Sequence, residues 1–286
     1  MDILAAVKNP LLITSLGIAC FGVNAQATTY YQSNGSSVEN FRSFLGSSVA
    51  ATPGATVQTS SPFIVNGVSQ GSYLSATNYP TANFSSTATA SSQGIWVGLL
   101  MNPATANFWG GGFALSRATT DSISQASFIV NTGWSGQGNT TKIVLLDWNQ
   151  NKSNDGYTVS VGQQIAVMIN VYDSGNSGTF NTASLYIDSD LTNGVSFSSA
   201  IVNGFNITTA ASQIKSIRLQ ADPGPTGYAE TRYYDNVIAS TSQQEVVKFL
   251  ATGQASAVPE PSTYGFIGVG ALGLAFAARR RKLKTV

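Results

Sequence analysis

The stretch that decides the fold is Gln164-Ile165-Ala166-Val167-Met168-Ile169-Asn170-Val171-Tyr172-Asp173. Every second residue from Ile165 to Val171 is aliphatic, a spacing typical of a β-strand. Because alternate side chains of a strand point to opposite faces of its sheet, Ile165, Val167, Ile169 and Val171 should share one buried face. The pattern predicts a strand packed on a core.

Short apolar runs of the same kind recur on both sides of this strand. They occupy residues 94–100, 113–116, 126–130, 142–148, 157–161, 183–187, 214–219 and 232–238. Turn-forming clusters of Gly, Asn, Asp, Ser and Pro separate many of these runs. Many short strands without interleaved helices predict an all-β fold, an antiparallel β-sandwich. A helix is predicted only at residues 243–250, with Ser242 as its N-cap.

The composition excludes several classes of function. The chain has no His, and its one Cys is Cys20 near the N-terminus. This excludes a Ser-His-Asp triad, and the region beyond residue 27 has no disulfide and no zinc site of the Cys or His type. Residues 28–258 hold eight basic and eleven acidic side chains, a net charge of −3. A nucleic-acid partner is therefore not expected.

The sequence also shows no evident pair of carboxylates for glycoside hydrolysis. Such an enzyme needs two carboxyl groups at a defined separation. The exported region offers only Glu39, Glu230 and Glu245 as glutamates, far apart in the sequence. The Glu-x-Asp-x-x-Glu motif of jelly-roll glucanases is absent, and its nearest counterpart is Asp188-Ser189-Asp190. The expectation is a protein that is not an enzyme.

The N-terminus reads as a signal peptide. Residues 11–21 form an apolar segment, Lys8 precedes it, and Ala25-Gln26-Ala27 follows as an A-x-A cleavage site. The predicted signal peptide is residues 1–27, with cleavage after Ala25 as an alternative. A lipoprotein acylated at Cys20 is a second alternative.

The C-terminus combines an extended motif, an apolar run and a basic cluster. The motif is Val258-Pro259-Glu260-Pro261-Ser262, in which the two prolines hold Glu260 in an extended conformation. Residues 264–278 carry no charge and predict a transmembrane helix of roughly 22 Å at 1.5 Å per residue. The basic anchor that follows comprises Arg279, Arg280, Arg281, Lys282 and Lys284. It should remain in the cytoplasm, which places the rest of the mature chain outside.

This order of parts resembles the PEP-CTERM sorting signal of Gram-negative bacteria. The resemblance implies processing by an exosortase, a membrane-embedded peptidase that cuts near the Pro-Glu-Pro segment. The alternative is an ordinary single-pass anchor with a proline-rich stalk. The predicted organisation is a signal peptide (1–27), a β-sandwich domain (28–250), a linker (251–257) and a sorting signal (258–286).

The sandwich itself resembles laminin-G-like or concanavalin-like jelly rolls. The matching strands are residues 165–172, 183–188, 217–219 and 234–239. The resemblance implies that the last of these strands runs beside the first strand of the domain. Many proteins of this kind bind glycans, some are structural, and a minority are glycoside hydrolases, so the fold does not select a function.

Two groups of residues are candidates for ligand contact. Asp173, Asp188 and Asp190 could supply oxygen ligands to Ca²⁺, or they could simply begin turns. Trp109 and Trp134 adjoin glycine-rich segments and could stack on sugar rings, or they could be core residues. Trp96 and Trp148 lie in apolar strands and are expected in the core. Apart from Ca²⁺, no cofactor is expected.

The sequence thus predicts an exported protein without enzymatic activity, structural in the envelope or biofilm matrix. The alternative is a glycan-binding, lectin-like module, and a glycoside hydrolase is the third possibility. The expected partners are the exosortase, the inner membrane before processing, and polysaccharide. The final location would be the cell surface or the extracellular matrix.

Overall fold

The computed structural model describes residues 27–33, 55–60, 62–76, 80–104, 112–119, 128–132, 140–147, 149, 151–219 and 231–254. The chain divides into two compact units, residues 1–254 and 255–286, and every described residue belongs to the first. The predicted signal peptide except Ala27, the predicted transmembrane helix at 264–278 and the predicted basic anchor lie outside the described residues. Within the described part, no helix has both the length and the hydropathy of a membrane span.

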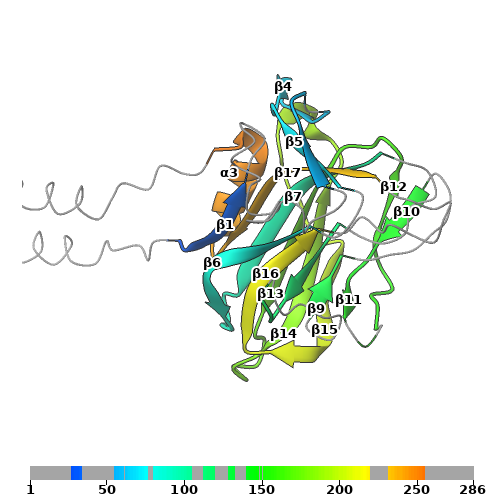
Figure 1. The fold of residues 1–286 in the computed structure, drawn as a ribbon. Coiled ribbons are helices and arrows are strands. Elements are labelled where there is room, and N and C mark those ends of the chain that lie inside the picture. Colours follow the sequence, from blue (N-terminus) through cyan, green and yellow to red (C-terminus); the bar gives the residue numbers. More distant parts are fainter. Residues whose placement is uncertain are drawn as a thin grey trace, which may run out of the picture. The chain divides into compact units, whose positions relative to one another are not determined.

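The described residues form an antiparallel β-sandwich of two large sheets (Figure 1). The larger sheet has the order β15-β14-β13-β7-β17-β5-β2, and β1 also pairs with β17. Its strands are β15 (Val202–Ala211), β14 (Phe180–Asp188), β13 (Ile165–Tyr172), β7 (Ile95–Pro103), β17 (Arg232–Ser240), β5 (Tyr73–Ala76), β2 (Ala55–Gln58) and β1 (Thr29–Ser33). The all-β, antiparallel prediction is confirmed.

The smaller sheet has the order β11-β9-β8-β16-β6. Its strands are β11 (Leu146–Asp147), β9 (Phe128–Asn131), β8 (Phe113–Ser116), β16 (Gln213–Leu219) and β6 (Thr81–Thr89). Two two-stranded sheets accompany the large ones, formed by β3 (Ile64–Val65) with β4 (Val68–Ser69) and by β10 (Thr140–Ile143) with β12 (Tyr157–Ser160).

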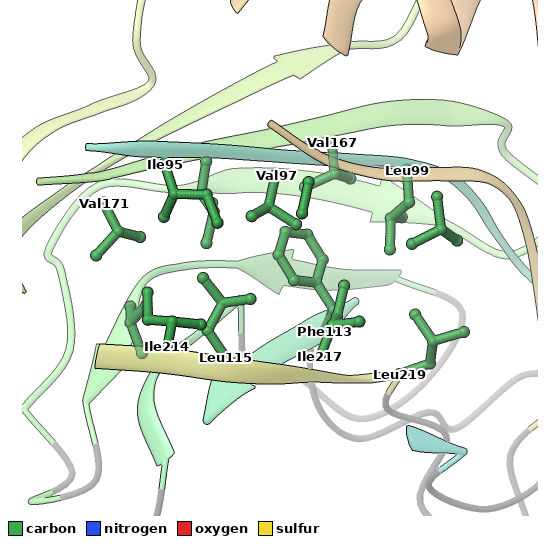
Figure 2. Packing of buried hydrophobic residues seen from close by; sticks show 14 of the residues in the cluster. Ile95, Val97, Leu99, Phe113, Leu115, Val167, Val171, Ile214, Ile217 and Leu219 are labelled. Carbon is green, nitrogen blue, oxygen red and sulfur yellow. The ribbon is translucent and has the colours of Figure 1, made fainter. Parts of the chain in front are cut away.

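The main core lies between the two sheets. Figure 2 shows Val97 and Val167 of the larger sheet facing Phe113 and Ile217 of the smaller one, all of them buried. The predicted face of β13 is confirmed, since its aliphatic residues at 165, 167, 169 and 171 are fully buried in this core. The period of two read from the sequence therefore identified the strand and its inward face.

A second apolar cluster lies on the outer face of the larger sheet, where helix α3 (Gln243–Thr252) packs. Ala166 and Met168 of β13 belong to one buried cluster with Val246, Phe249 and Leu250 of the helix. Strand β13 is therefore buried on both faces over most of its length, which the one-sided alternation did not indicate.

Gly98 of β7 allows the helix to approach the sheet closely. A Cβ atom at this position would lie 2.7 Å from Val246 Cγ1 and 2.9 Å from Leu250 Cδ1, closer than such atoms can approach. The absence of a side chain at residue 98 thus makes room for α3.

Helix α3 begins and ends at typical capping residues. The Ser242 hydroxyl accepts a hydrogen bond from the Glu245 amide at 3.3 Å, which confirms the predicted N-cap. Gly253 has a left-handed φ of 64°, and its amide donates to the Phe249 carbonyl at 2.7 Å. The helix continues through Thr252, two residues into the segment expected to be linker.

Strand β1 joins the beginning of the predicted mature region to the end of the domain. It pairs with β17 from Thr29 opposite Ser240 to Ser33 opposite Val237. The Thr28 amide also donates to Thr241 Oγ1 at 2.9 Å. The last strand therefore runs beside the first, as the jelly-roll resemblance implied.

Candidate functional site

Several predicted site residues lie outside the described part of the chain. These are the sorting motif at residues 258–262, the basic anchor at 279–284, and the two tryptophans proposed for ligand contact, Trp109 and Trp134. Their roles remain predictions. The three aspartates, by contrast, are all described.

Asp173 organises the loop between β13 and β14. Its Oδ1 accepts hydrogen bonds from the amides of Gly175 and Ser177, at 3.2 and 2.9 Å, and its Oδ2 accepts from the Gly178 amide at 2.6 Å. Burial would raise the pKa of this carboxyl, but the bonds from Ser177, Gly178 and Gly175 outweigh burial and lower the pKa to about 2. The Asp173 carboxylate thus holds the loop between β13 and β14 in place through hydrogen bonds to the backbone amides of that loop.

Asp188 and Asp190 cap the turn that follows β14. Asp188 accepts from the amides of Asp190 and Ser196, at 3.0 and 2.7 Å. Asp190 is the N-cap of the short 3₁₀ helix η6 (Leu191–Asn193), and the side-chain and backbone hydrogen bonds from Thr192 lower its pKa. Both residues begin turns, as one of the two sequence interpretations expected.

The strand register separates Asp173 from the other two aspartates. In the β13–β14 hairpin, Asp188 lies opposite Ala166, whereas Tyr172, just before Asp173, lies opposite Thr182. At about 3.3 Å per residue, the ends of this hairpin are about 20 Å apart. One cation could not bind Asp173 and Asp188 together, so the structure does not combine the three predicted ligands. Among the described residues, no group of three or more His, Cys, Asp or Glu side chains could hold a metal ion.

Sequence reasoning missed a further carboxylate, Asp147, which ties two strands together. It is buried at the end of β11, and its Oδ2 accepts from the Thr208 amide of β15 at 3.0 Å. Asn151 donates to the same carboxylate from its backbone and its side chain. Burial would raise the pKa of Asp147, but the bonds from Thr208 and Asn151 hold it below its usual range. Because Thr208 is distant in sequence, no local pattern indicated this contact.

The outer face of the larger sheet carries a group of aromatic residues beside α3. Trp96, expected in the core, is instead half-buried on this outer face. Its ring centroid lies 5.6 Å from that of Tyr186, with the planes inclined by 45°. Tyr186 in turn contacts Phe197 edge-on, with centroids 6.4 Å apart. The alternation of Trp96 with buried Ile95 and Val97 could have revealed its orientation, because neighbours in a strand face opposite sides.

Polar side chains accompany these rings. Asn170 of β13 lies between Trp96 of β7 and Ser184 of β14 in one cross-strand row. The Asn170 Oδ1 atom is buried and has no hydrogen-bond partner. Burial raises the pKa of the Tyr186 hydroxyl, and nearby Tyr172 raises it further. The outer face thus combines aromatic rings with neutral hydrogen-bonding groups.

The described architecture defines a β-sandwich domain that is followed in the chain by a separate C-terminal segment. A model of the PEP-CTERM protein-sorting motif matches residues 257–282 of this segment. The chain therefore carries a PEP-CTERM sorting motif, a substrate signal for exosortase processing. The match includes the predicted motif 258–262 and the basic residues up to Lys282.

Among solved structures, the chain has a distant similarity in fold to several domains of known structure. The globular domain of T. cruzi calreticulin is 10% identical, with a TM-score of 0.45, over 88% of this chain and 100% of that one. The botulinum neurotoxin serotype D binding domain is 11% identical, with a TM-score of 0.39, over 70% of this chain and 47% of that one. The exoplasmic/lumenal domain of VIP36, in its Ca²⁺/Man3GlcNAc-bound form, is 10% identical, with a TM-score of 0.36, over 65% of this chain and 84% of that one. No curated protein sequence matches the chain.

Proposed function

We propose that this protein is an exported, non-enzymatic β-sandwich that an exosortase processes and that then serves as a structural component of the cell surface or extracellular matrix. The observation that carries the proposal is the sorting motif at residues 257–282, which follows the β-sandwich and its capped helix α3 in the chain. In this proposal the motif directs sorting and processing, and the β-sandwich domain is the part of the protein that remains at its final location.

The chemistry of the tail supports this route. Pro259 and Pro261 hold the intervening Glu260 in the extended backbone form that a peptidase can grip. The uncharged residues 264–278 would hold the chain in the inner membrane until cleavage, with the basic anchor in the cytoplasm. Cleavage near the motif would then release or transfer the domain without its anchor.

The described carboxylates support a structural role for the sandwich. Asp147, Asp173, Asp188 and Asp190 all accept hydrogen bonds from their own loops or from a neighbouring strand. A carboxylate that caps a loop is held in place and is poorly available as an acid, a base or a nucleophile. The chain also lacks His altogether, which removes the commonest general base.

Substitution in the sorting motif tests the proposal. Glu260→Ala, or the double change of Pro259 and Pro261 to Ala, should leave an uncut inner-membrane species, because the grip site is lost while the apolar segment is not. Ser256→Ala, which lies before the matched motif, is the control and should be processed normally. Cell fractionation with intact-mass measurement of the surface protein gives the answer.

The same experiment separates the proposal from an ordinary membrane anchor. An exosortase substrate should lack residues 264–278 once it reaches the surface. Surface material that still contains these residues, in the wild type as in the variants, would support the single-pass anchor and contradict processing. Reporter fusions add the topology: a fusion after Val286 should be cytoplasmic and one at Gly253 exported.

A further inference from the structure

We infer that the tip of the β3–β4 hairpin contacts the lipid bilayer that holds the uncut chain. The contact is apolar and is made by Ile64 of β3 and Val68 of β4. The inference rests on the proposed function, because it requires the predicted membrane segment at residues 264–278 to keep the chain at the membrane. It adds to that function the surface of the sandwich that faces the bilayer before cleavage.

The hairpin tip presents aliphatic side chains to solvent. Ile64 and Val68 are 52% and 62% exposed, and no other large hydrophobic side chain of the described residues is exposed to this extent. Single exposed apolar residues are ordinary on protein surfaces, but these two lie in one short hairpin. Residues 43–116, which include the hairpin, contain no charged side chain. The tip can therefore enter an apolar phase without dehydrating a charge of its own.

The hairpin is held firmly by the sandwich. Asn66 and Gly67 form its turn with φ values of 50° and 74°, the left-handed pair typical of a two-residue hairpin loop. The Asn66 amide donates to the Leu191 carbonyl at 2.8 Å. Phe63 and Val65 are buried in the cluster that includes α3. The exposed tip is thus already ordered, so contact with lipid would cost little additional conformational entropy.

The root of the hairpin lies beside the last turns of α3, where the described chain ends. The Asn236 side-chain amide donates to Gln70 Oε1, directly after the hairpin, at 2.9 Å. The same amide donates to the Leu250 carbonyl of α3 at 3.0 Å. Helix α3 ends at Thr252, and Gln254 is the last described residue. The hairpin and the exit of the tail therefore share one end of the sandwich.

The length of chain after α3 limits the distance between this end and the membrane. From Gln254 to residue 264, where the apolar segment begins, a fully extended chain would span at most about 35 Å. A globular domain of the length of residues 28–254 has a diameter of about 45 Å. Because the connection is shorter than the domain is wide, the end beside α3 is the one that meets the bilayer. The short connection also keeps the local concentration of lipid high, so that two side chains suffice for contact.

The charges near the hairpin favour contact with hydrocarbon rather than with charged headgroups. Asp188 and Asp190 lie close to Leu191 in the chain, and Lys248 lies in the second half of α3. Because these charges have both signs, they would not select an anionic lipid. Aliphatic side chains gain free energy on leaving water whatever the headgroup. The partner is therefore the apolar part of the bilayer and not a particular lipid.

Fluorescence quenching by lipid tests the inference on the uncut chain. Cys20 is the only cysteine and lies in the predicted signal peptide, so Ser69→Cys gives the exported chain a single site for a fluorophore on the hairpin. The protein, produced in a host without an exosortase, is reconstituted into phosphatidylcholine vesicles in which part of the lipid carries a nitroxide on its acyl chain. The label at residue 69 should be quenched. Replacing part of the phosphatidylcholine with phosphatidylglycerol should not increase the quenching.

A matched control lies in the loop between β13 and β14. A side chain at Gly175 would meet no atom within 4 Å, so Gly175→Cys accepts the same label. The hairpin register places this loop at the opposite end of β14 from Asp188, and its label should stay unquenched. In the Ser69→Cys protein, Ile64→Ser with Val68→Ser should reduce quenching to the level at residue 175. Ile64→Leu with Val68→Ile should retain it, and thermal melting shows whether each variant is folded.

Flotation of the vesicles separates failure of this inference from failure of the proposed function. A chain that floats with the vesicles but is quenched equally at residues 69 and 175 would overturn the inference and leave the membrane segment in place. A chain that does not float would contradict the membrane segment and, with it, this inference. Self-quenching at residue 69 that rises with protein density, without quenching by nitroxide lipid, would assign the tip to a second copy of the chain and also overturn the inference.

Discussion

Glu245 of helix α3 accepts a hydrogen bond at 3.1 Å from Thr29 of strand β1, a residue 216 positions earlier in the chain. The Ser240 hydroxyl of β17 donates to the same carboxylate oxygen. One carboxylate therefore connects the first described strand, the last strand and the closing helix. This contact joins the two ends of the domain, and its contribution can be measured.

Replacing Thr29 with Val should destabilise the domain by roughly 1 kcal/mol. Valine keeps the β-branched shape of the strand but removes the hydroxyl that donates to Glu245. Urea unfolding monitored by circular dichroism gives the free energy. Thr87→Val, at an exposed position of β6, is the control and should change stability by less than about 0.5 kcal/mol. Equal effects of the two changes would contradict a specific role for the contact.

Replacing Gly98 with Ala should displace α3. The added Cβ would overlap with Val246 Cγ1 and Leu250 Cδ1, and overpacking of this kind costs about 1–3 kcal/mol. Val246→Ala shortens the side chain that faces residue 98. The double variant Gly98→Ala/Val246→Ala should therefore be destabilised by less than the sum of the two single changes. Unfolding of both single variants and of the pair completes a double-mutant cycle. If the changes in unfolding free energy of the two single variants simply add in the double variant, residue 98 does not set the distance between helix and sheet.

Replacing Ile169 with Ala should cost about 2–5 kcal/mol of unfolding free energy. Ile169 is fully buried between the sheets, and its truncation would leave a cavity in close-packed surroundings. Val68→Ala removes aliphatic atoms from a side chain that is 62% exposed and should have little effect. Denaturant titration compares the two, and a loss under 1 kcal/mol for Ile169→Ala would be inconsistent with the core described above.

Asp173 should make stability fall in acid. Its folded pKa of about 2 lies below the value of about 3.9 for an unfolded Asp. The group therefore stabilises the fold fully above about pH 4 and loses this contribution as the pH falls toward 2. In the Asp173→Asn variant, the melting temperature should fall less between pH 4 and pH 2 than it does in the wild type. Parallel curves for the two proteins would show that the carboxylate is not the responsible group.

The sequence predicted what depends on local patterns. The aliphatic alternation of β13, the Ser242 cap and the turn-forming aspartates are each encoded within a few residues, and the structure has them all. Features created by pairing between distant segments were not predictable in this way. The second buried face of β13 depends on a cluster to which α3 and several other distant segments contribute, and the Asp147–Thr208 contact depends on how β11 meets β15.

In the candidate site, too, local sequence identified the residues, whereas the pairing of the strands determined where they lie. Asp173, Asp188 and Asp190 are close in the sequence, yet the hairpin register places the first at the opposite end from the other two. Trp96 lies in an apolar run, which suggested the core, but its parity in β7 directs it to the outer face. Composition identifies a residue as apolar, whereas the strand register determines which surface it occupies.

The position of β17 has a consequence for the order in which the protein is made and moved. This strand pairs with β7 along one edge and with β5 and β1 along the other, although it is the last strand of the described residues. The larger sheet therefore lacks its strand between β7 and β5 until residue 240 has been synthesised. Contacts over such long sequence separations form slowly. A nascent chain whose leading end is already crossing a membrane would thus meet the translocation machinery still unfolded, and the sandwich would close only on the far side.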